Sequence, residues 1–168
     1  MNSTLRHKSG ASFATVVCSL DAGVHERLGY LGFRLDTECY AIRISQISEI
    51  LRVPPVTAVP RSSSAIMGIV GVRGKVLTVI DLRCRLGLTV PPPTRQSRIL
   101  VLPWADHDSV GLYVDRVLEV YRLSHSDIEP SVVGLGRDQS DHVAGIARVA
   151  GELVLIVRLE QFLDLLNK

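Results

Sequence analysis

The hydrophobic and polar positions of this chain alternate in short runs that are separated by turn-forming residues. Residues 30–35 (YLGFRL) and 39–45 (CYAIRIS) flank the turn-forming stretch DTE, and alternation along the second run places Tyr40, Ile42 and Ile44 on one face. Further runs of this kind are KVLTVID at 75–81, SRILVLP at 97–103, DSVGLYVD at 108–115, HVAGIARV at 142–149 and GELVLIVRL at 151–159. Strands this short and this frequent predict a mainly β fold built from small barrels.

Two segments have helical rather than strand character. Residues 81–88 (DLRCRLGL) follow a strand run, with Asp81 in a position to cap the first turn and Gly87 near the end. Residues 159–168 are the second segment, in which four apolar side chains recur on one stripe of a helix: Leu159, Phe162, Leu163 and Leu166. The sequence therefore predicts a short helix in mid-chain and a core-facing helix at the C-terminus.

The chain contains an internal repeat. Residues 40–51 (YAIRISQISEIL) align without a gap on residues 110–121 (VGLYVDRVLEVY), with an offset of 70 positions. Residues 68–86 align in the same way on residues 145–163, with an offset of 77 positions. The two alignments predict two similar small barrels, related by a pseudo-twofold axis, that bury their apolar faces against each other.

The proline-rich stretch PPPT separates the two halves of the repeat as a stiff spacer. The expected subdomains are therefore residues 29–92 and 93–168, and exchange of a strand or helix between them is left open. Residues 1–28 match neither half. For them the sequence predicts a poorly ordered tail or a mis-assigned start.

The repeat also shows which residues of the second hairpin turn the fold itself needs. Gly74 aligns with Gly151, so a glycine at this place serves the geometry of the turn. Arg73 aligns with Ala150, so the turn does not require an arginine. Arg73 is therefore a solvated loop residue, a residue that neutralises a nearby carboxylate, or a hydrogen-bond donor displayed for a partner. The two candidate carboxylates are Asp81 and Glu49.

Composition narrows the functional classes. The 168 residues include 19 Lys and Arg and 17 Asp and Glu, and the resulting net charge of +2 is too small to predict a polyanionic partner. The cysteines Cys18, Cys39 and Cys84 are dispersed, as are the five histidines, so reduced thiols in the cytoplasm are expected and a metal site is not. No stretch is long and apolar enough to predict a membrane span.

No segment carries a complete catalytic or cofactor motif. The glycine-rich stretch 67–83 lacks the spacing of a phosphate-binding loop, and Val76 stands where that loop has Ser or Thr. The serines at 62–64 have neither a nucleophile elbow nor an identifiable base. Glu49 and Glu119 are repeat mates, which favours exposed positions on two equivalent strands over a paired-carboxylate site. We therefore expect neither an enzyme nor a bound cofactor.

These stretches together resemble one known family. The run from YAIRISQISEIL through PVTAVP to IMGIVGVRGKVLTVIDLRCRLGL, followed by VGLYVDRVLEV and GELVLIVRLEQFL, is similar to the CheW-like domain over residues 30–166. The resemblance implies two SH3-like five-stranded barrels and a non-catalytic adaptor of the cytoplasm, recruited to receptor arrays at the inner membrane. Its implied partners are the regulatory domain of a CheA-type histidine kinase, the cytoplasmic tip of methyl-accepting chemoreceptors and further copies within an array. Neither nucleic acid nor membrane insertion is implied.

The resemblance also implies a partner-binding site. Arg73 matches the arginine of the family's Asn-Leu-Arg-Gly turn, and Gly68 matches the glycine that opens this hairpin. Ile47 and Glu49 match a stretch implicated in receptor and kinase contacts. The predicted partner-binding residues are Ile47, Glu49, Gly68, Val70, Arg73 and Val114.

Some features leave alternatives open. Val70 and Val114 are either core residues or walls of a groove between the barrels in which a helical hairpin docks. Gly71 stands where the family usually has Asn, and Thr78 where it usually has Pro. These departures leave room for a specialised pathway, such as one for surface motility. A nucleic-acid-binding SH3-like barrel is a weaker alternative, because the sequence lacks clustered basic residues with interleaved aromatics.

Overall fold

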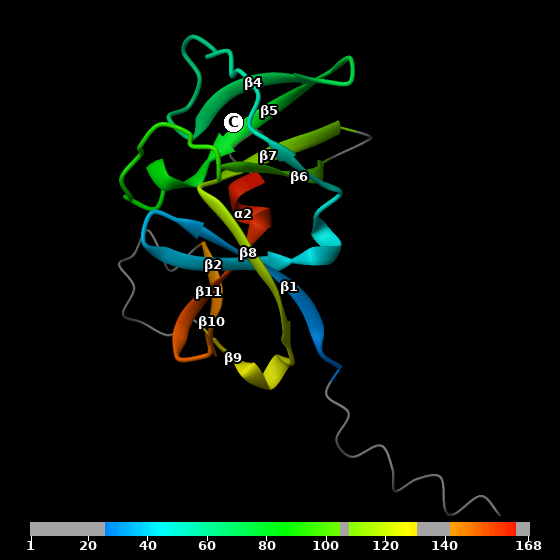
Figure 1. Ribbon diagram of the computed structural model, residues 1–168, viewed down its shortest axis with the longest axis vertical. Coiled ribbons are helices and arrows are strands. Elements are labelled where there is room, and N and C mark those ends of the chain that lie inside the picture. Colours follow the sequence, from blue (N-terminus) through cyan, green and yellow to red (C-terminus); the bar gives the residue numbers. More distant parts are fainter. Residues whose placement is uncertain (1–25, 105–107, 131–141, 164–168) are drawn as a thin grey trace, which may run out of the picture.

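The protein folds mainly into β-strands that form two sheets (Figure 1). The computed structural model describes residues 26–104, 108–130 and 142–163. Six-stranded sheet A has the order β8 (Arg116–Leu123), β1 (Leu28–Leu35), β2 (Glu38–Arg43), β11 (Glu152–Val157), β10 (Val143–Val149), β9 (Ile128–Pro130). Five-stranded sheet B has the order β3 (Glu49–Arg52), β6 (Arg98–Trp104), β7 (Asp108–Val114), β5 (Lys75–Asp81), β4 (Ile66–Val72). The helices of the described part are short: η3 (Ile44–Gln46), η4 (Leu82–Cys84), η5 (His125–Asp127) and α2 (Leu159–Leu163). The predicted mainly β fold is confirmed, whereas the predicted tail lies outside the described residues apart from 26–28.

The two sheets share one strand order. Read in order, the five strands of sheet B correspond to the first five strands of sheet A: β3 to β8, β6 to β1, β7 to β2, β5 to β11 and β4 to β10. Sheet A has β9 as an additional strand. One pair in each sheet is parallel, β5 with β7 and β11 with β2. Each sheet thus combines strands from both halves of the chain, because β6 and β7 enter sheet B while β1 and β2 enter sheet A. The subdomain boundary at residue 92 stays a prediction.

Strand register reproduces both offsets of the sequence repeat. Thr78 pairs with Val110 in sheet B, and Leu155 pairs with Tyr40 in sheet A. Thr78 and Leu155 are related by the offset of 77, and Tyr40 and Val110 by the offset of 70. The same contact between a hairpin of one half and a hairpin of the other therefore occurs twice, as expected of two pseudo-equivalent units.

The two equivalent hairpins also have the same turn. Arg73 and Gly74 connect β4 to β5 with φ angles of 50° and 79°, and Ala150 and Gly151 connect β10 to β11 with φ angles of 48° and 84°. Positive φ at both central residues is the type I′ geometry, whose twist matches that of the flanking strands. Glycine adopts this conformation without strain, while Arg73 and Ala150 hold a left-handed conformation that side chains disfavour.

Each sheet curls until the chain beyond its first edge strand reaches the opposite edge. Thr57, five residues beyond the end of β3, exchanges two hydrogen bonds of 2.9 and 2.8 Å with Ile69 of β4. Five residues span at most about 18 Å, whereas a flat sheet would separate β3 from this place by about 24 Å. In sheet A, β9 follows β8 in the chain and pairs with β10 on the far edge. The curvature is consistent with the expected SH3-like barrels.

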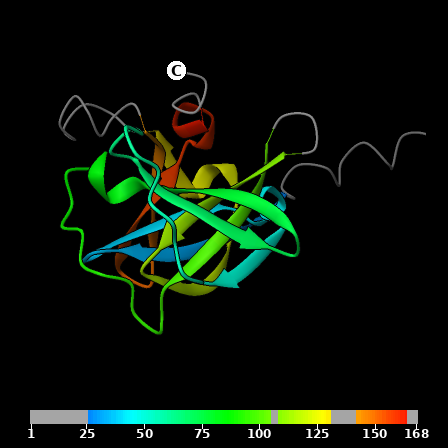
Figure 2. The same ribbon diagram turned by 90° about the horizontal axis from the view of Figure 1, so that it is seen from above.

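Apolar side chains form a cluster between the sheets and one cluster within each sheet. Phe33, Tyr40, Leu100 and Val114 lie in the cluster between the sheets, and viewed from above, sheet B covers sheet A (Figure 2). The cluster within sheet A surrounds Ala41, Tyr121 and Ile156, and the cluster within sheet B surrounds Val79, Ile99 and Tyr113. Burial of these clusters supplies the main driving force for folding.

Both predicted helical segments contain helix among the described residues, three residues in η4 and Leu159–Leu163 in α2. Asp81 caps η4 as expected, because its Oδ1 accepts a 3.0 Å hydrogen bond from the N–H of Arg83. α2 lies between the sheets (Figure 1), where Leu159 is buried and Leu163 packs against the cluster between the sheets. The Phe162 side chain and Leu166, which were expected on the same stripe, lie outside the described part. No helix among the described residues is long and apolar enough to cross a membrane.

One position of the first hairpin was predicted wrongly. Ile44 was expected to lie on the same strand face as Tyr40 and Ile42, both of which are buried between the sheets. Ile44 is instead 45% exposed. β2 ends at Arg43 and the chain enters η3, so the alternation of a strand no longer applies at Ile44.

Candidate partner-binding surface

Arg73 lies at the tip of the β4–β5 hairpin and forms an ion pair with Glu49. Its Nη2 donates a hydrogen bond of 2.5 Å to Glu49 Oε1, and its Nη1 donates one of 3.1 Å to Glu49 Oε2. The Arg73 side chain is 76% exposed and the Glu49 side chain 33%. Glu49 begins edge strand β3, which the curl of sheet B brings close to the hairpin of the other edge. Of the two carboxylates considered from the sequence, Glu49 is therefore the one that Arg73 contacts.

A depression with an exposed apolar side chain lies beside this ion pair. Its volume is about 660 Å³, and its lining residues are Glu49, Val72, Arg73, Lys75, Val76, Leu77, Val101 and Ser109. Val76 is 71% exposed, whereas Leu77 and Val101 are buried in its floor. Alternation along KVLTVID could have revealed Val76, because it places this residue opposite to the inward-facing Leu77. An exposed arginine–carboxylate pair beside an apolar side chain has the chemistry of a protein-binding surface.

The equivalent hairpin tip of sheet A has the same geometry and a different chemistry. Ala150 takes the place of Arg73, and Leu153, the repeat mate of Val76, is 52% exposed. A depression of about 360 Å³ lies beside this tip as well. The exposed apolar side chain is thus common to both tips. Sheet A also has an exposed arginine–glutamate pair, Arg34 with Glu152 at 2.6 Å, but its arginine lies on β1, so only sheet B has an arginine in the turn itself.

The remaining predicted residues lie in other environments. Ile47 is partly buried and packs against the cluster between the sheets. Val70 is buried within sheet B, and Val114 is fully buried between the sheets, so neither side chain lines an open groove. The structure therefore brings only Arg73 and Glu49 together at the surface, and partner contacts of the other residues stay predictions.

Gly68 has a backbone function that its position in the sheet explains. Its φ is 150°, and a Cβ at this place would lie 2.4 Å from the carbonyl oxygen of Thr57, the residue that closes sheet B. Its repeat mate Gly145 faces the same constraint, since a Cβ there would lie 2.5 Å from Ile128 Cγ2. Both glycines thus make room for the chain segment that closes each sheet.

A buried arginine is a structural feature that sequence reasoning missed. Arg83 is 1% exposed and pairs with Asp81 and Asp115, at 2.7 Å in each case. Its guanidinium carbon lies 4.3 Å from the centre of the Tyr113 ring. Burial alone would lower the pKa of Arg83, but the hydrogen bond to Asp81 and the two negative charges raise this pKa above its ordinary value. The Asp-Leu-Arg spacing was visible in the sequence, whereas the contact with Asp115, 32 residues away, was not.

The fold and this surface define a mainly β scaffold with two pseudo-equivalent sheets, one of which displays an arginine at its hairpin tip, paired with a glutamate. The family model of the CheW-like domain matches residues 29–167. The chain is 33% identical over 138 residues to the chemotaxis protein CheW of Helicobacter pylori, with 82% of each chain covered. It is 31% identical over 132 residues to the chemotaxis protein CheW of Bacillus subtilis, with 79% of this chain and 84% of that one covered.

The structure is also similar to the crystal structure of the scaffolding protein TtCheW from Thermoanaerobacter tengcongensis. The TM-score is 0.72 at 30% sequence identity, and the match covers 79% of this chain and 85% of that one. The chain belongs to the CheW-like domain family, which is a family of chemotaxis scaffold proteins.

Proposed function

We propose that this protein is a non-catalytic adaptor that couples methyl-accepting chemoreceptors to a CheA-type histidine kinase. Its place in a family of chemotaxis scaffold proteins supports the proposal. The observation that carries it for this chain is the exposed Arg73–Glu49 pair beside Val76. The partners are the kinase regulatory domain and the cytoplasmic tip of the receptors, in arrays at the inner membrane that further copies of this protein extend.

Arg73 is the main polar contact in this proposal. A guanidinium has five N–H donors, and the two bonds to Glu49 use one on each terminal nitrogen. The remaining donors are available to a partner's carboxylate or carbonyl groups. Glu49 holds the guanidinium in one orientation, which lowers the entropy lost on binding. Val76 adds apolar area, and covering a side chain of this size completely contributes roughly 1.5–3 kcal/mol.

The other predicted residues support the surface in different ways. Ile47 precedes β3 and contacts the cluster between the sheets, so its exposed part extends the surface along the seam between the sheets. Gly68 and Val70 shape β4 beneath the hairpin, and Val114 anchors the end of β7. We assign these three residues a supporting role and Ile47 a direct one.

The affinity of two variants for the partners tests the proposal. Arg73→Ala should weaken binding to the kinase regulatory domain or to the receptor tip by about 2 kcal/mol or more, roughly a 30-fold loss of affinity, because a central arginine contact is removed. The change should lower the free energy of unfolding by less than about 1 kcal/mol, because exposed ion pairs contribute little. Isothermal titration calorimetry and urea denaturation measure the two effects.

Ala150→Arg is the matched control for this experiment. Ala150 occupies the same turn position in sheet A at nearly the same φ, so an arginine fits its backbone as well as it fits the backbone of Arg73. Affinity for both partners should change by less than about twofold, within the scatter of surface substitutions. Unchanged affinity of Arg73→Ala for both partners would leave Arg73 as an ordinary surface residue and remove the basis of the proposal.

A further inference from the structure

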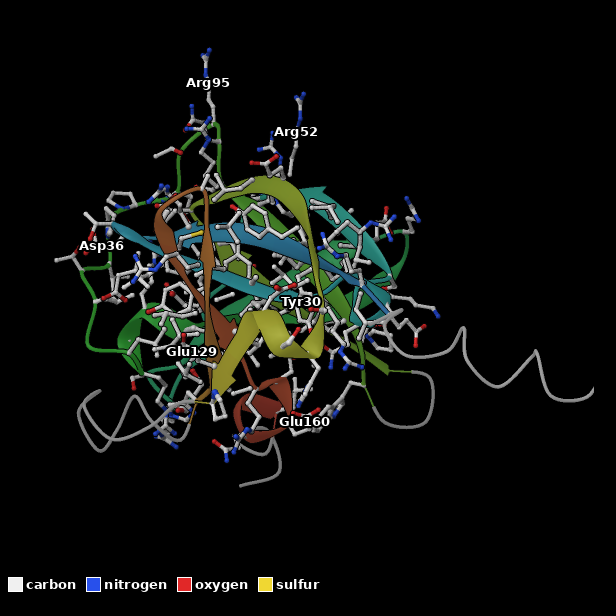
Figure 3. The ribbon with its side chains drawn as sticks, turned by 90° about the horizontal axis from the view of Figure 1, so that it is seen from below. Tyr30, Asp36, Arg52, Arg95, Glu129 and Glu160 are labelled. Atoms are coloured by element: carbon white, nitrogen blue, oxygen red, sulfur yellow. The ribbon has the colours of Figure 1, made fainter. Side chains whose placement is uncertain are left out.

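Four arginines that are scattered in the sequence gather on one surface of the fold. Arg52 ends β3, Arg98 begins β6, Arg95 lies in the turn before β6, and Arg116 begins β8. Arg52 and Arg98 are directly opposite each other in the antiparallel pair of β3 and β6. Arg52 and Arg95 project from the same side of the molecule (Figure 3). We call these four residues the arginine surface.

The charges of the arginine surface have no ion-pair partner among the residues that the structure describes. The four ion pairs in that part of the protein involve Arg34, Arg73 and Arg83 only. Two like charges directly opposite each other in an antiparallel pair lower the stability of a sheet. Arg52 and Arg98 therefore carry a cost in stability that no ion pair within the described fold offsets, which points to a function outside the fold.

Three of the four arginines, Arg95, Arg98 and Arg116, line a shallow depression, and Arg52 lies opposite Arg98 on the neighbouring strand. Its volume is about 190 Å³, and its lining residues are Arg95, Gln96, Arg98, Arg116 and Val117. Arg98 Nη1 donates hydrogen bonds of 2.9 and 2.7 Å to the carbonyl oxygens of Arg95 and Ser97. The buried hydroxyl of Ser97 in turn contacts the Tyr113 hydroxyl at 2.8 Å. The turn that carries Arg95 and the adjoining Arg98 are thus connected to the core by hydrogen bonds. These bonds hold the Arg98 guanidinium in place before a ligand binds.

The chemistry of this depression favours carboxylates on a protein over other anions. Guanidinium forks bind carboxylates and phosphates with two parallel hydrogen bonds. The volume lies below the range of about 300–1,000 Å³ that is usual for small-molecule pockets. None of the described residues that line it is aromatic, whereas proteins that bind single-stranded nucleic acid stack bases on aromatic rings.

We propose that the arginine surface binds an acidic segment of a protein partner, a stretch in which several Asp or Glu side chains lie close together. The site is distinct from the Arg73–Glu49 pair, because Glu49 begins β3 and Arg52 ends it. It adds a second, electrostatic contact to the adaptor, and its effect decreases as the ionic strength rises.

A titration of the full chain with a capped hexaglutamate peptide tests this proposal. The signals of the Arg Nε–H groups, followed by nuclear magnetic resonance at about 20 mM salt, should shift saturably for the four arginines and return at about 300 mM salt. Arg52→Glu should weaken binding by about fivefold or more, because it removes one positive charge and neutralises a second. The melting temperature of Arg52→Glu should be equal to or higher than that of the wild type, since the substitution replaces a like-charge pair with an opposite-charge pair.

Arg148→Glu is the matched control, because Arg148 is exposed on β10 and the change in net charge is the same. Its affinity for hexaglutamate should stay within about twofold of the wild type. If both variants lose the same affinity for hexaglutamate, the effect is due to net charge alone and the proposal is overturned. The absence of saturable binding by the wild type would also overturn it. A hexathymidylate that binds the same arginines more tightly than hexaglutamate would also overturn it, in favour of nucleic acid.

Discussion

At the scale of single residues, Arg83 shows how a charge is kept inside this fold. Two carboxylates, Asp81 and Asp115, compensate its guanidinium, and Arg83 Nη1 also donates a 3.2 Å hydrogen bond to the carbonyl oxygen of Pro91. Asp115 Oδ2 accepts a further bond from the N–H of Asp36 in the β1–β2 turn. Arg83 therefore connects the end of β5 in sheet B with a turn of sheet A, and its contribution is to position the two sheets.

Arg83→Ala should lower the free energy of unfolding by about 3–5 kcal/mol, because it leaves the buried Asp81 carboxylate and the partly buried Asp115 carboxylate without their counter-charge. A loss of this size is a large fraction of the stability of an ordinary domain. Urea denaturation measures it, with Arg85→Ala as the control, since Arg85 is exposed two residues further along the same turn. The control should change stability by less than about 0.5 kcal/mol. Equal effects of the two substitutions would show that Arg83 does not brace the sheets.

At the scale of elements, the two hairpin turns make a comparison within one molecule possible. Ala150 holds a φ of 48° although alanine disfavours the left-handed region. Ala150→Asn should therefore raise the free energy of unfolding by about 0.5–1 kcal/mol, because Asn-Gly is a preferred type I′ turn. Arg73→Asn should give a similar gain, reduced by the lost ion pair with Glu49, and should weaken partner binding. Thermal melting of both variants measures the gains, and a lower melting temperature for Ala150→Asn would contradict the assigned turn type.

The elements also show which features of the fold can be predicted from the sequence alone. Alternating runs and the paired glycines Gly74 and Gly151 were sufficient to predict strands, turns and the repeat, because these features depend on local backbone geometry. Ile44 was misplaced because its strand ends one residue earlier than the apolar pattern. The position of Arg52 directly opposite Arg98 could not be predicted, since it depends on which strands pair and in what register. Alternation tells which face a side chain occupies but not which strand lies beside it.

At the scale of the whole molecule, the exchange of hairpins links the two halves of the chain. β1 and β2 complete sheet A beside β11, and β6 and β7 complete sheet B beside β5. The cluster between the sheets receives side chains from both sheets, so the two hairpins belong to sheets that share one apolar core. A scaffold of this kind can hold different partners at a set spacing, and Arg73 distinguishes one tip from the other.

The measurement that tests the adaptor function most directly is the autophosphorylation rate of the kinase in a reconstituted mixture with receptor fragments and this protein. The wild type should make the kinase rate respond to the receptors, Arg73→Ala should reduce that response by about fivefold or more, and Ala150→Arg should leave it within about twofold. A kinase rate that responds to the receptors equally well without this protein, or a full response with Arg73→Ala, would contradict the account.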